Sequence, residues 1–138
     1  MQKYIAIDLL SGTLTRLTPK NMICFFVVNK PHDKTLIDKV ALEFIDQGIW
    51  YHFYGQYEPV WHLAFDETNI KVYPNSTEES VAMTCGYDDL AEFAEEIYRT
   101  FYSHFFIPTD VYLFYDDNEV YENLKYLLAA MESNSIKG

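Results

Sequence analysis

The chain is poor in glycine, cysteine and basic residues, and each shortage excludes a class of protein. Only 5 of the 138 residues are Gly, and neither a glycine-rich phosphate loop nor a dinucleotide-binding fingerprint is present. The two cysteines, Cys24 and Cys85, make neither a disulfide framework nor a zinc-ligand pattern. No targeting segment and no apolar run of membrane-spanning length occurs. We therefore expect a cytoplasmic protein without a bound metal or cofactor.

Basic residues are outnumbered in one part of the chain only. Ten Lys and Arg stand against 21 Asp and Glu, which gives a net charge of −11. Residues 1–57 hold six bases and five acids, whereas residues 58–138 hold four bases and sixteen acids. The negative electrostatic field of residues 58–138 repels nucleic acid and anionic membranes, because phosphate binding needs clustered Lys and Arg. It attracts a basic protein and speeds the encounter with it, unless the acidity serves solubility alone.

Apolar sequence, by contrast, is plentiful. It makes up 49% of the chain, and 17% of the residues are aromatic. At this length we expect one domain, residues 1–138, with a sizeable core. Apolar strands alternate with amphipathic helices, which favours an α/β domain of three layers. The expected architecture is a mostly parallel or mixed sheet of about five strands, flanked by three helices.

The spacing of apolar residues predicts the individual elements. Residues 22–28 and 111–115 are continuously apolar, as in central strands that are covered on both faces. Residues 4–9 alternate, as in an edge strand. Asp33 is placed to cap the first helix and Gly48 to close it. The other predicted elements are strands at 49–54 and 80–84 and helices at 34–47, 88–102 and 118–132.

Residues 55–80 are the part of the chain that is hardest to predict. Within that stretch, residues 60–65 are expected to form a strand or a loop with a short helix, and residues 70–73 another short strand. The interior should contain the apolar faces of the elements on either side. Its predicted members are Phe26, Val28, Val40, Phe44, Met83, Phe93, Ile97, Leu113 and Leu124.

Polar side chains follow several of the predicted strands. The carboxyl ends of parallel strands meet at one edge of a sheet, and domains of this kind hold their ligands there. This places residues 29–32, 55–61, 84–89 and 116–118 near one another. Besides Gln56, the candidate pocket residues are Trp61, His62, Thr84, Cys85, Tyr87, Asp88 and Asp116.

Three groups in this set have a chemical interpretation and a simpler one. Cys85 precedes a helix N-terminus, where a thiolate is stabilised, but it is also typical of an unreactive turn thiol. His62 with Asp66 is either a general base with its orienting acid or a packed histidine. Asp116-Asp117, with Asp88, suits a hard cation such as magnesium, but Asp117 or Asn118 is also well placed to cap a helix. We adopt the simpler interpretation each time, so no residue is assigned as catalytic and no metal site is expected.

Several features occur in a set order: Tyr54-Gly55 at a strand end, then Trp61 and Asp66, then the strand residues 81–84, and then the acids Asp88-Asp89. In this order, over about residues 4–130, the chain resembles a family of small bacterial α/β domains of unknown function. That family continues its strand with a Thr-Trp-His portion, which Cys85, Gly86 and Tyr87 replace here. The resemblance implies the same fold and assigns no activity.

These features predict a non-enzymatic acidic binding protein, such as an immunity or inhibitor protein that neutralises a basic toxin or nuclease. The alternative is a small hydrolase or ligand-binding domain of flavodoxin-like type, with its pocket at the carboxyl ends of the strands. A third interpretation is a structural subunit whose edge strand 4–9 pairs with a copy of itself, so the chain is a monomer or a homodimer. The candidate partner-binding residues, on the acidic face of the predicted helix 88–102, are Asp89, Glu92, Glu95 and Glu96.

Overall fold

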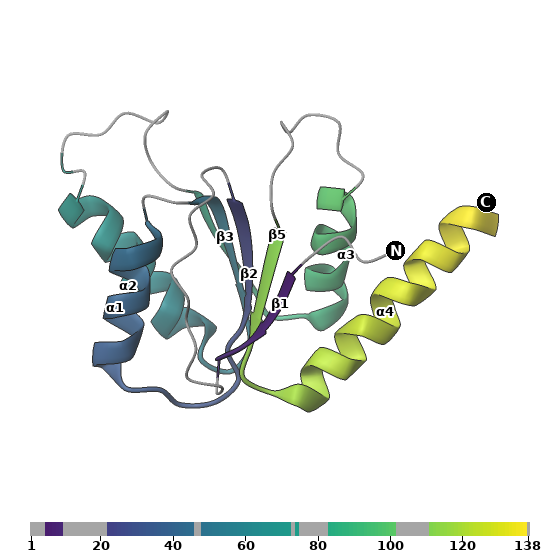
Figure 1. Ribbon diagram of the computed structural model, residues 1–138, viewed down its shortest axis with the longest axis horizontal. Helices are drawn as coiled ribbons and strands as arrows, with labels where there is room; N and C mark the ends of the chain where they lie inside the picture. Colours follow the sequence, from purple (N-terminus) through teal and green to yellow (C-terminus); the bar gives the residue numbers. More distant parts are fainter. Residues whose placement is uncertain are drawn as a thin grey trace.

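A five-stranded parallel sheet forms the centre of the molecule (Figure 1). The computed structural model describes residues 5–9, 22–45, 48–72, 74, 83–101 and 111–137. Neighbouring strands are parallel throughout, in the order β1-β5-β2-β3-β4. The elements in chain order are β1 (Ile5–Asp8), β2 (Met22–Val27), α1 (Lys34–Phe44), β3 (Gly48–Tyr54), α2 (Glu58–Val72), β4 (Met83–Tyr87), α3 (Leu90–Phe101), β5 (Val111–Tyr115) and α4 (Asn118–Lys137).

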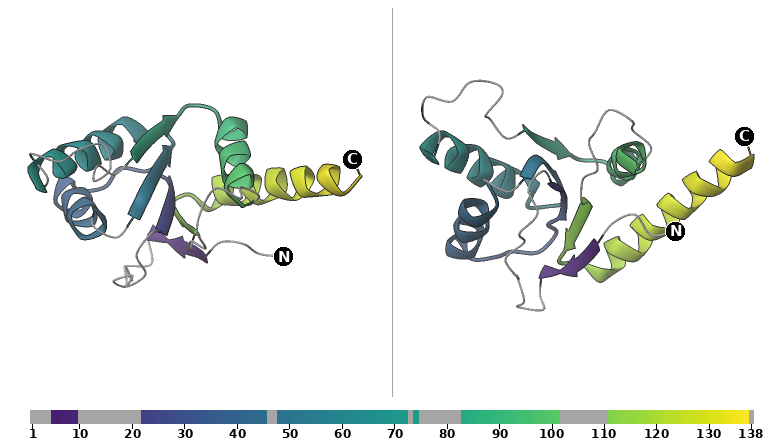
Figure 2. Two further views of the ribbon diagram at one scale, coloured as in Figure 1. Left: turned by 90° about the horizontal axis from the view of Figure 1, so that it is seen from above. Right: turned by 45° about the horizontal axis from the view of Figure 1, so that its top comes forward.

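Helices cover the two faces of the sheet in pairs. α1 and α2 pack on one face and α3 and α4 on the other, and both views in Figure 2 show this separation. The chain runs outward from β2 through β3 to β4, then returns to β5, which lies between β1 and β2. The predicted three-layer α/β domain is confirmed, as a doubly wound sheet of the flavodoxin-like kind. The winding reverses between β2 and β5, and domains of this type place their sites beyond the strand ends at such a point.

The two predicted central strands, β2 and β5, are confirmed as central and buried. Phe25 and Phe26 occupy consecutive positions of β2, so they point to opposite faces, and both are fully buried. Residues 111–114 of β5 are buried as well. β1 lies at the edge of the sheet, as its alternating pattern predicts. Tyr4, which the prediction included in that strand, lies outside the described residues.

The strand alternative for residues 60–65 and the short strand predicted at 70–73 are wrong, because residues 58–72 form helix α2. Residue 73 lies outside the described residues. Trp61 and Phe65 face the sheet, but Ile70 on the same helix is 69% exposed. Apolar residues on both sides of a helix hide the 3.6-residue period by which helices are recognised. The described part of the chain therefore holds four helices rather than three, and none of these has the length and apolar character needed to cross a bilayer.

The fourth strand extends further along the chain than the sequence predicts. Predicted at residues 80–84, it runs from Met83 to Tyr87, and residues 80–82 lie outside the described part. Met83 is thus the first residue of an edge strand and is 53% exposed. Its predicted burial is wrong. The other eight predicted core residues are each at most 1% exposed.

The helix boundaries differ from the predicted ones by a few residues. α1 ends at Phe44, and Gly48 begins β3 instead of closing the helix; residues 46 and 47 are not described. Asp33 occupies the N-cap position, yet its side chain makes no capping hydrogen bond. α3 begins at Leu90 and α4 continues to Lys137, beyond the predicted end at residue 132.

One glycine is required by the turn after β3. Gly55 has a φ of +129°, and a Cβ there would lie 2.5 Å from the carbonyl oxygen of Val28. A side chain would therefore be strained and would also clash. The same Val28 oxygen accepts a hydrogen bond from the Tyr57 N–H at 3.0 Å. This close approach fixes the start of α2 beside the end of β2.

Candidate functional site

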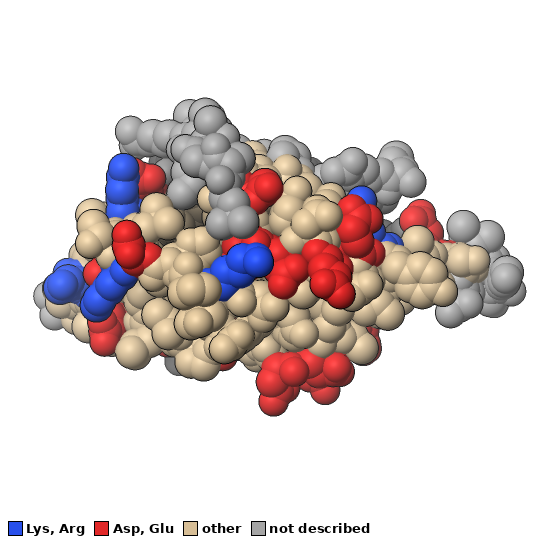
Figure 3. Space-filling view, turned by 90° about the horizontal axis from the view of Figure 1, so that it is seen from below, with Lys and Arg blue, Asp and Glu red and all other residues tan. Residues whose placement is uncertain are grey.

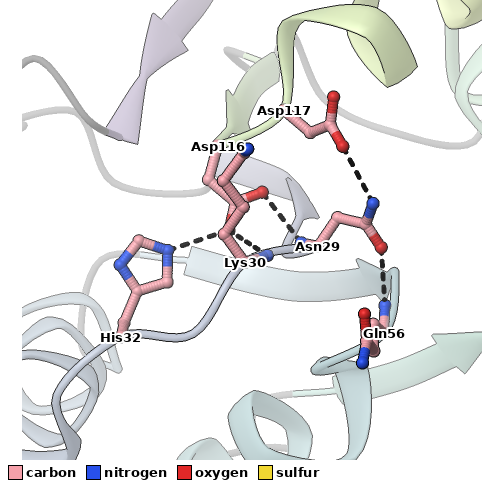
Figure 4. Close-up of polar contacts among 6 residues, drawn as sticks. All are labelled: Asn29, Lys30, His32, Gln56, Asp116 and Asp117. Carbon is pink, nitrogen blue, oxygen red and sulfur yellow. Dashed lines mark hydrogen bonds and ion pairs between the residues drawn. The ribbon is translucent and has the colours of Figure 1, made fainter.

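Asp116 lies buried directly after β5, where the winding reverses (Figure 4). Its Oδ1 accepts a hydrogen bond from the Asn29 N–H at 2.8 Å. Its Oδ2 accepts from the Lys30 N–H at 3.1 Å and from His32 Nε2 at 2.8 Å. A carboxylate removed from water needs such donors, because an unpaired buried charge is very costly. Asp116 therefore ties the loop that follows β2 to the end of β5.

Asn29 connects three loops at this edge. Its Nδ2 donates to Asp117 Oδ2 at 2.8 Å, and its Oδ1 accepts from the Gln56 N–H at 3.0 Å. The hydrogen bond from Asn29 lowers the pKa of Asp117. Asp117 Oδ1 also accepts from two backbone N–H groups in the first turn of α4. The prediction that Asp117 caps a helix is confirmed.

The polar side chains at the edge where a crevice was expected are bonded to the protein itself. Both oxygens of Asp116 and both polar atoms of the Asn29 side chain are engaged. The ring of Trp61, which is 1% exposed, lies beneath His32 with the ring centroids 5.8 Å apart. This edge is a cross-linked surface formed by three loops.

A second polar cluster joins α2 to the edge strand β4. His62 Nδ1 lies 2.9 Å from Glu58 Oε1, and His62 Nε2 lies 3.1 Å from Thr84 Oγ1. Thr84 donates its proton to Asp66 Oδ1 at 2.6 Å. Gly86 makes room for this arrangement, because a Cβ at that position would overlap the Glu58 carboxylate. We call Glu58, His62, Asp66 and Thr84 the α2–β4 cluster.

Hydrogen-bond accounting shows what the α2–β4 cluster can do. A carboxylate only accepts, so His62 Nδ1 donates to Glu58. His62 Nε2 faces the Thr84 hydroxyl at 3.1 Å and Asp66 Oδ2 at 3.5 Å, so the ring lies between two acids. These acids face different nitrogens, so they cannot share a metal with the ring, and no metal-binding group of His, Cys, Asp and Glu occurs among the described residues.

A buried polar contact lies on the other face of β3 and β4. His52 Nδ1 is 2.8 Å from the Tyr87 hydroxyl, and the His52 ring stacks on Phe25 with centroids 4.4 Å apart. Burial lowers the pKa of His52 to about 3 and raises that of Tyr87, so both side chains are neutral. His52 Nε2 is buried with no hydrogen-bond partner in the part of the chain that is described. Cys85, beside His52 in the register, is a free, partly exposed thiol.

The structure therefore divides the predicted pocket residues among four places. Asp116 lies at the cross-linked edge, with Trp61 below it. Alternate residues of a strand point to opposite faces, so Thr84 joins the α2–β4 cluster while Tyr87 faces α3. Asp88 is exposed just beyond β4. These residues meet in small groups, and a role for them in ligand binding stays a prediction.

The acids predicted to bind a partner lie at the start and along the outer side of α3. Asp89, Glu92 and Glu95 are exposed, and Glu96 is partly buried. Arg99 pairs with Glu95 at 2.9 Å and with Glu96 at 3.0 Å, whereas Asp89 and Glu92 pair with no base in the described ranges. Figure 3 looks at the carboxyl ends of the strands and shows acidic side chains gathered toward the α3–α4 side.

Sequence reasoning misses four residues that organise these clusters. It places residues 29–32 at the correct edge but singles out neither Asn29 nor His32, because nothing in the sequence marks them. The Glu58 carboxylate can take its position only because Gly86 has no side chain, and Gly86 resembles a turn signal in the sequence. His52 lies in an aromatic strand, where it is taken for one more packed ring.

A parallel α/β fold is shared by proteins of many unrelated functions, so the fold assigns none. The resemblance to small bacterial domains of unknown function stays a prediction. Comparisons with protein-family models, with curated proteins and with solved structures find no match for this chain.

Proposed function

We propose that the protein is a non-enzymatic binding protein that neutralises a basic protein, such as a toxin or a nuclease, in the cytoplasm. The observation that carries this proposal is an edge cross-linked by its own side chains and bordered by exposed carboxylates. Both cysteines are free thiols, in keeping with a reducing compartment. We call the exposed acids at the starts of α3 and α4 the acidic rim; its members are Asp88, Asp89, Glu92 and Glu119.

The cross-linked edge favours a macromolecular partner over a small ligand. A small ligand is held in place by a few polar groups that are free to bind it, but Asn29 and Asp116 already use their polar side-chain atoms within the protein. A protein partner needs a surface that is already ordered, because ordering loops on binding weakens affinity. The same bonds hold the loops beside the acidic rim in place.

The position of the acidic rim suits a cationic partner. The N-terminus of a helix stabilises nearby carboxylates through the helix dipole, so acids here keep their charge at little cost to stability. A surface of one sign raises association rates by about 10- to 1,000-fold at low salt. Lys30 is an exposed base in the loop after β2, and it gives a partner one point of opposite charge by which to set its orientation.

The test measures inhibition of a panel of small basic ribonucleases by the purified protein, at low and at high salt. We expect at least one enzyme to be inhibited at a one-to-one ratio, with association slowed about tenfold by high salt. Asp89→Asn combined with Glu92→Gln should slow association about tenfold and change dissociation little. A panel that is not inhibited at either salt concentration contradicts the proposal.

The matched control removes the same charge from the opposite layer. Asp38→Asn combined with Glu43→Gln changes two exposed acids of α1 and should alter association by no more than about twofold. Equal slowing by the two double variants would mean that net charge, and not the acidic rim, determines binding. All four positions are exposed, so both variants should unfold like the wild type.

One observation favours the hydrolase alternative. The Thr84 hydroxyl, the His62 ring and the Glu58 carboxylate lie in series, which is the order of a nucleophile, its base and an orienting acid. This reading requires that the Thr84 proton turn from Asp66 toward His62. Hydrolysis of p-nitrophenyl acetate by Thr84→Val and by the control Thr68→Val separates the two functions. Loss in Thr84→Val alone supports a hydrolase, and equal rates support the binding protein.

A further inference from the structure

The outward side of α2 exposes apolar side chains along its length. Val60, Leu63 and Ile70 are 48%, 58% and 69% exposed. A helix that covers a sheet ordinarily turns polar residues outward, and exposed apolar groups gathered on one surface mark an interaction site. Spacings of three and seven residues place these three side chains on one stripe.

Exposed positions of α2 are arranged symmetrically about the level of Phe65. Reversing α2 end for end about Phe65 exchanges positions 59 and 71, 60 and 70, and 63 and 67, and all six are exposed. A two-fold contact needs a patch that matches itself in this way, because the same residues serve both subunits. We call these positions the α2 stripe: Pro59, Val60, Leu63, Glu67, Ile70 and Lys71.

The charges around the α2 stripe favour a second copy as its occupant. The exposed charged residues on the outer sides of α1 and α2 are three bases and three acids, so they cancel. By contrast, the whole chain carries −11, and two copies that meet through most other surfaces repel each other. A neutral surface gives a basic partner no electrostatic attraction. The balanced set is Lys34, Lys39, Lys71, Asp38, Glu43 and Glu67.

The shape of the neighbouring surface also suits a packed helix. A groove of about 200 Å³ runs between α1 and α2 and includes Glu67 and Lys71 of the α2 stripe. Leu42, Ala64 and Val72 give it an apolar lining. Side chains from an opposing helix can enter such a groove, as ridges enter grooves in helix pairs.

We propose that α2 packs antiparallel against α2 of a second copy. The two-fold axis crosses the outer side of α2 at the level of Phe65, whose own side chain faces the sheet. In this register Leu63 lies against Glu67 of the second copy, Ile70 against Pro59, and Val60 along the aliphatic part of Lys71. The contact uses the layer opposite the acidic rim, so the dimer leaves both rims open. It is independent of the function proposed above.

Sedimentation equilibrium from about 1 μM to about 1 mM protein tests the dimer, a range that covers weak self-association. The wild type should change from the mass of one chain to that of two. Leu63→Glu places an acid beside Glu67 of the second copy and should stay a single chain throughout. Leu63→Lys removes the same apolar group but pairs with Glu67, so it should still dimerise. The difference between these two variants reports the antiparallel register.

Tyr126→Glu on α4 is the control, because Tyr126 is 76% exposed and lies in the other layer. It should dimerise like the wild type. Thermal unfolding should be nearly unchanged for Leu63→Glu, since that side chain is exposed. A wild type that stays a single chain overturns the proposal. So does equal loss of the dimer in both Leu63 variants, or loss of the dimer in Tyr126→Glu.

Discussion

The two helical layers cover the same sheet, but their outer surfaces differ in chemistry. The α1–α2 layer leaves large apolar side chains such as Leu63 and Ile70 in solvent. The α3–α4 layer has acids there, and α3 separates a buried face around Phe93 from an exposed face around Glu92. Packing on a sheet constrains only the residues on the inner face of a helix. The residues on its outer face can therefore differ between layers without a change of fold. The α1–α2 layer exposes apolar side chains beside balanced charges, whereas the α3–α4 layer exposes mainly negative charge.

The inner sides of the two layers differ as well. In the α1–α2 layer the Phe26 ring contacts five other aromatic rings: Phe44, Phe53, Trp61, Phe65 and Phe114. In the α3–α4 layer the Phe93 ring contacts Phe25, Tyr54 and Tyr87. That second layer also encloses the polar ring of His52. The first layer encloses one buried polar side chain too, Asn69 of α2. The layers therefore differ mainly in their central rings, and Phe26 packs against more aromatic rings than Phe93 does.

Truncating the central ring of each layer should give the largest effect. Phe26→Ala should lower the free energy of unfolding by about 4–5 kcal/mol and Phe93→Ala by about 3–4 kcal/mol, from lost transfer energy plus the cavity. Urea unfolding followed by circular dichroism measures both. A larger loss for Phe93→Ala would show that the α3–α4 layer, with its buried polar ring, is the better packed one.

The buried histidine should give the α3–α4 layer a pH dependence. His52 has a pKa of about 3 in the fold and about 6.5 when unfolded, so between these values the unfolded chain binds the extra proton. Stability should therefore fall as the pH drops through this window, by up to about 1.4 kcal/mol per pH unit from this group.

His52→Phe should flatten that acid limb, because the new ring keeps the stacking on Phe25 but cannot be protonated. The free energy of unfolding from pH 7 to pH 4, in wild type and variant, checks this. Parallel curves would mean that His52 does not contribute and that other groups cause the acid loss.

A surface change on α3 should give the smallest effect on stability. Arg99 is 64% exposed and pairs with Glu95 and Glu96, and such exposed pairs contribute little. Arg99→Ala should cost less than about 1 kcal/mol while raising the association rate with a basic ribonuclease, because it leaves both acids uncompensated. A large loss of stability with no change in association would assign Arg99 a structural role.

The same contrast explains what the sequence could predict. Val111 to Phe114 and the helix around Phe93 were predictable, because continuous or one-sided apolar patterns have one structural solution. α2 was not, since Leu63 and Ile70 on its outside break the pattern that Trp61 defines on its inside. A helix with apolar residues on its inner and outer sides lacks the one-sided pattern by which a helix is recognised in a sequence.

The candidate site was predictable as a place and not as a set of contacts. The order of strands brings the segments around Asn29 and Asp116 together, which follows from the fold alone. Which atoms bond depends on side-chain reach and on small spaces. Gly86 is an example, since it resembles a turn residue in the sequence, but in the structure it admits the Glu58 carboxylate.

β5 is synthesised long after the two strands that flank it in the sheet, and this order affects how the chain folds during synthesis. β5 lies between β1 and β2. The Asn29 N–H donates to the side chain of Asp116, which is synthesised 87 residues later. At usual rates of synthesis, about 5–20 s separate the emergence of β1 from that of β5. During this interval β1 lacks the one partner it has among the described strands, and the edge of β2 that will receive β5 is exposed. The nascent chain should therefore depend on chaperones until its last strand has left the ribosome.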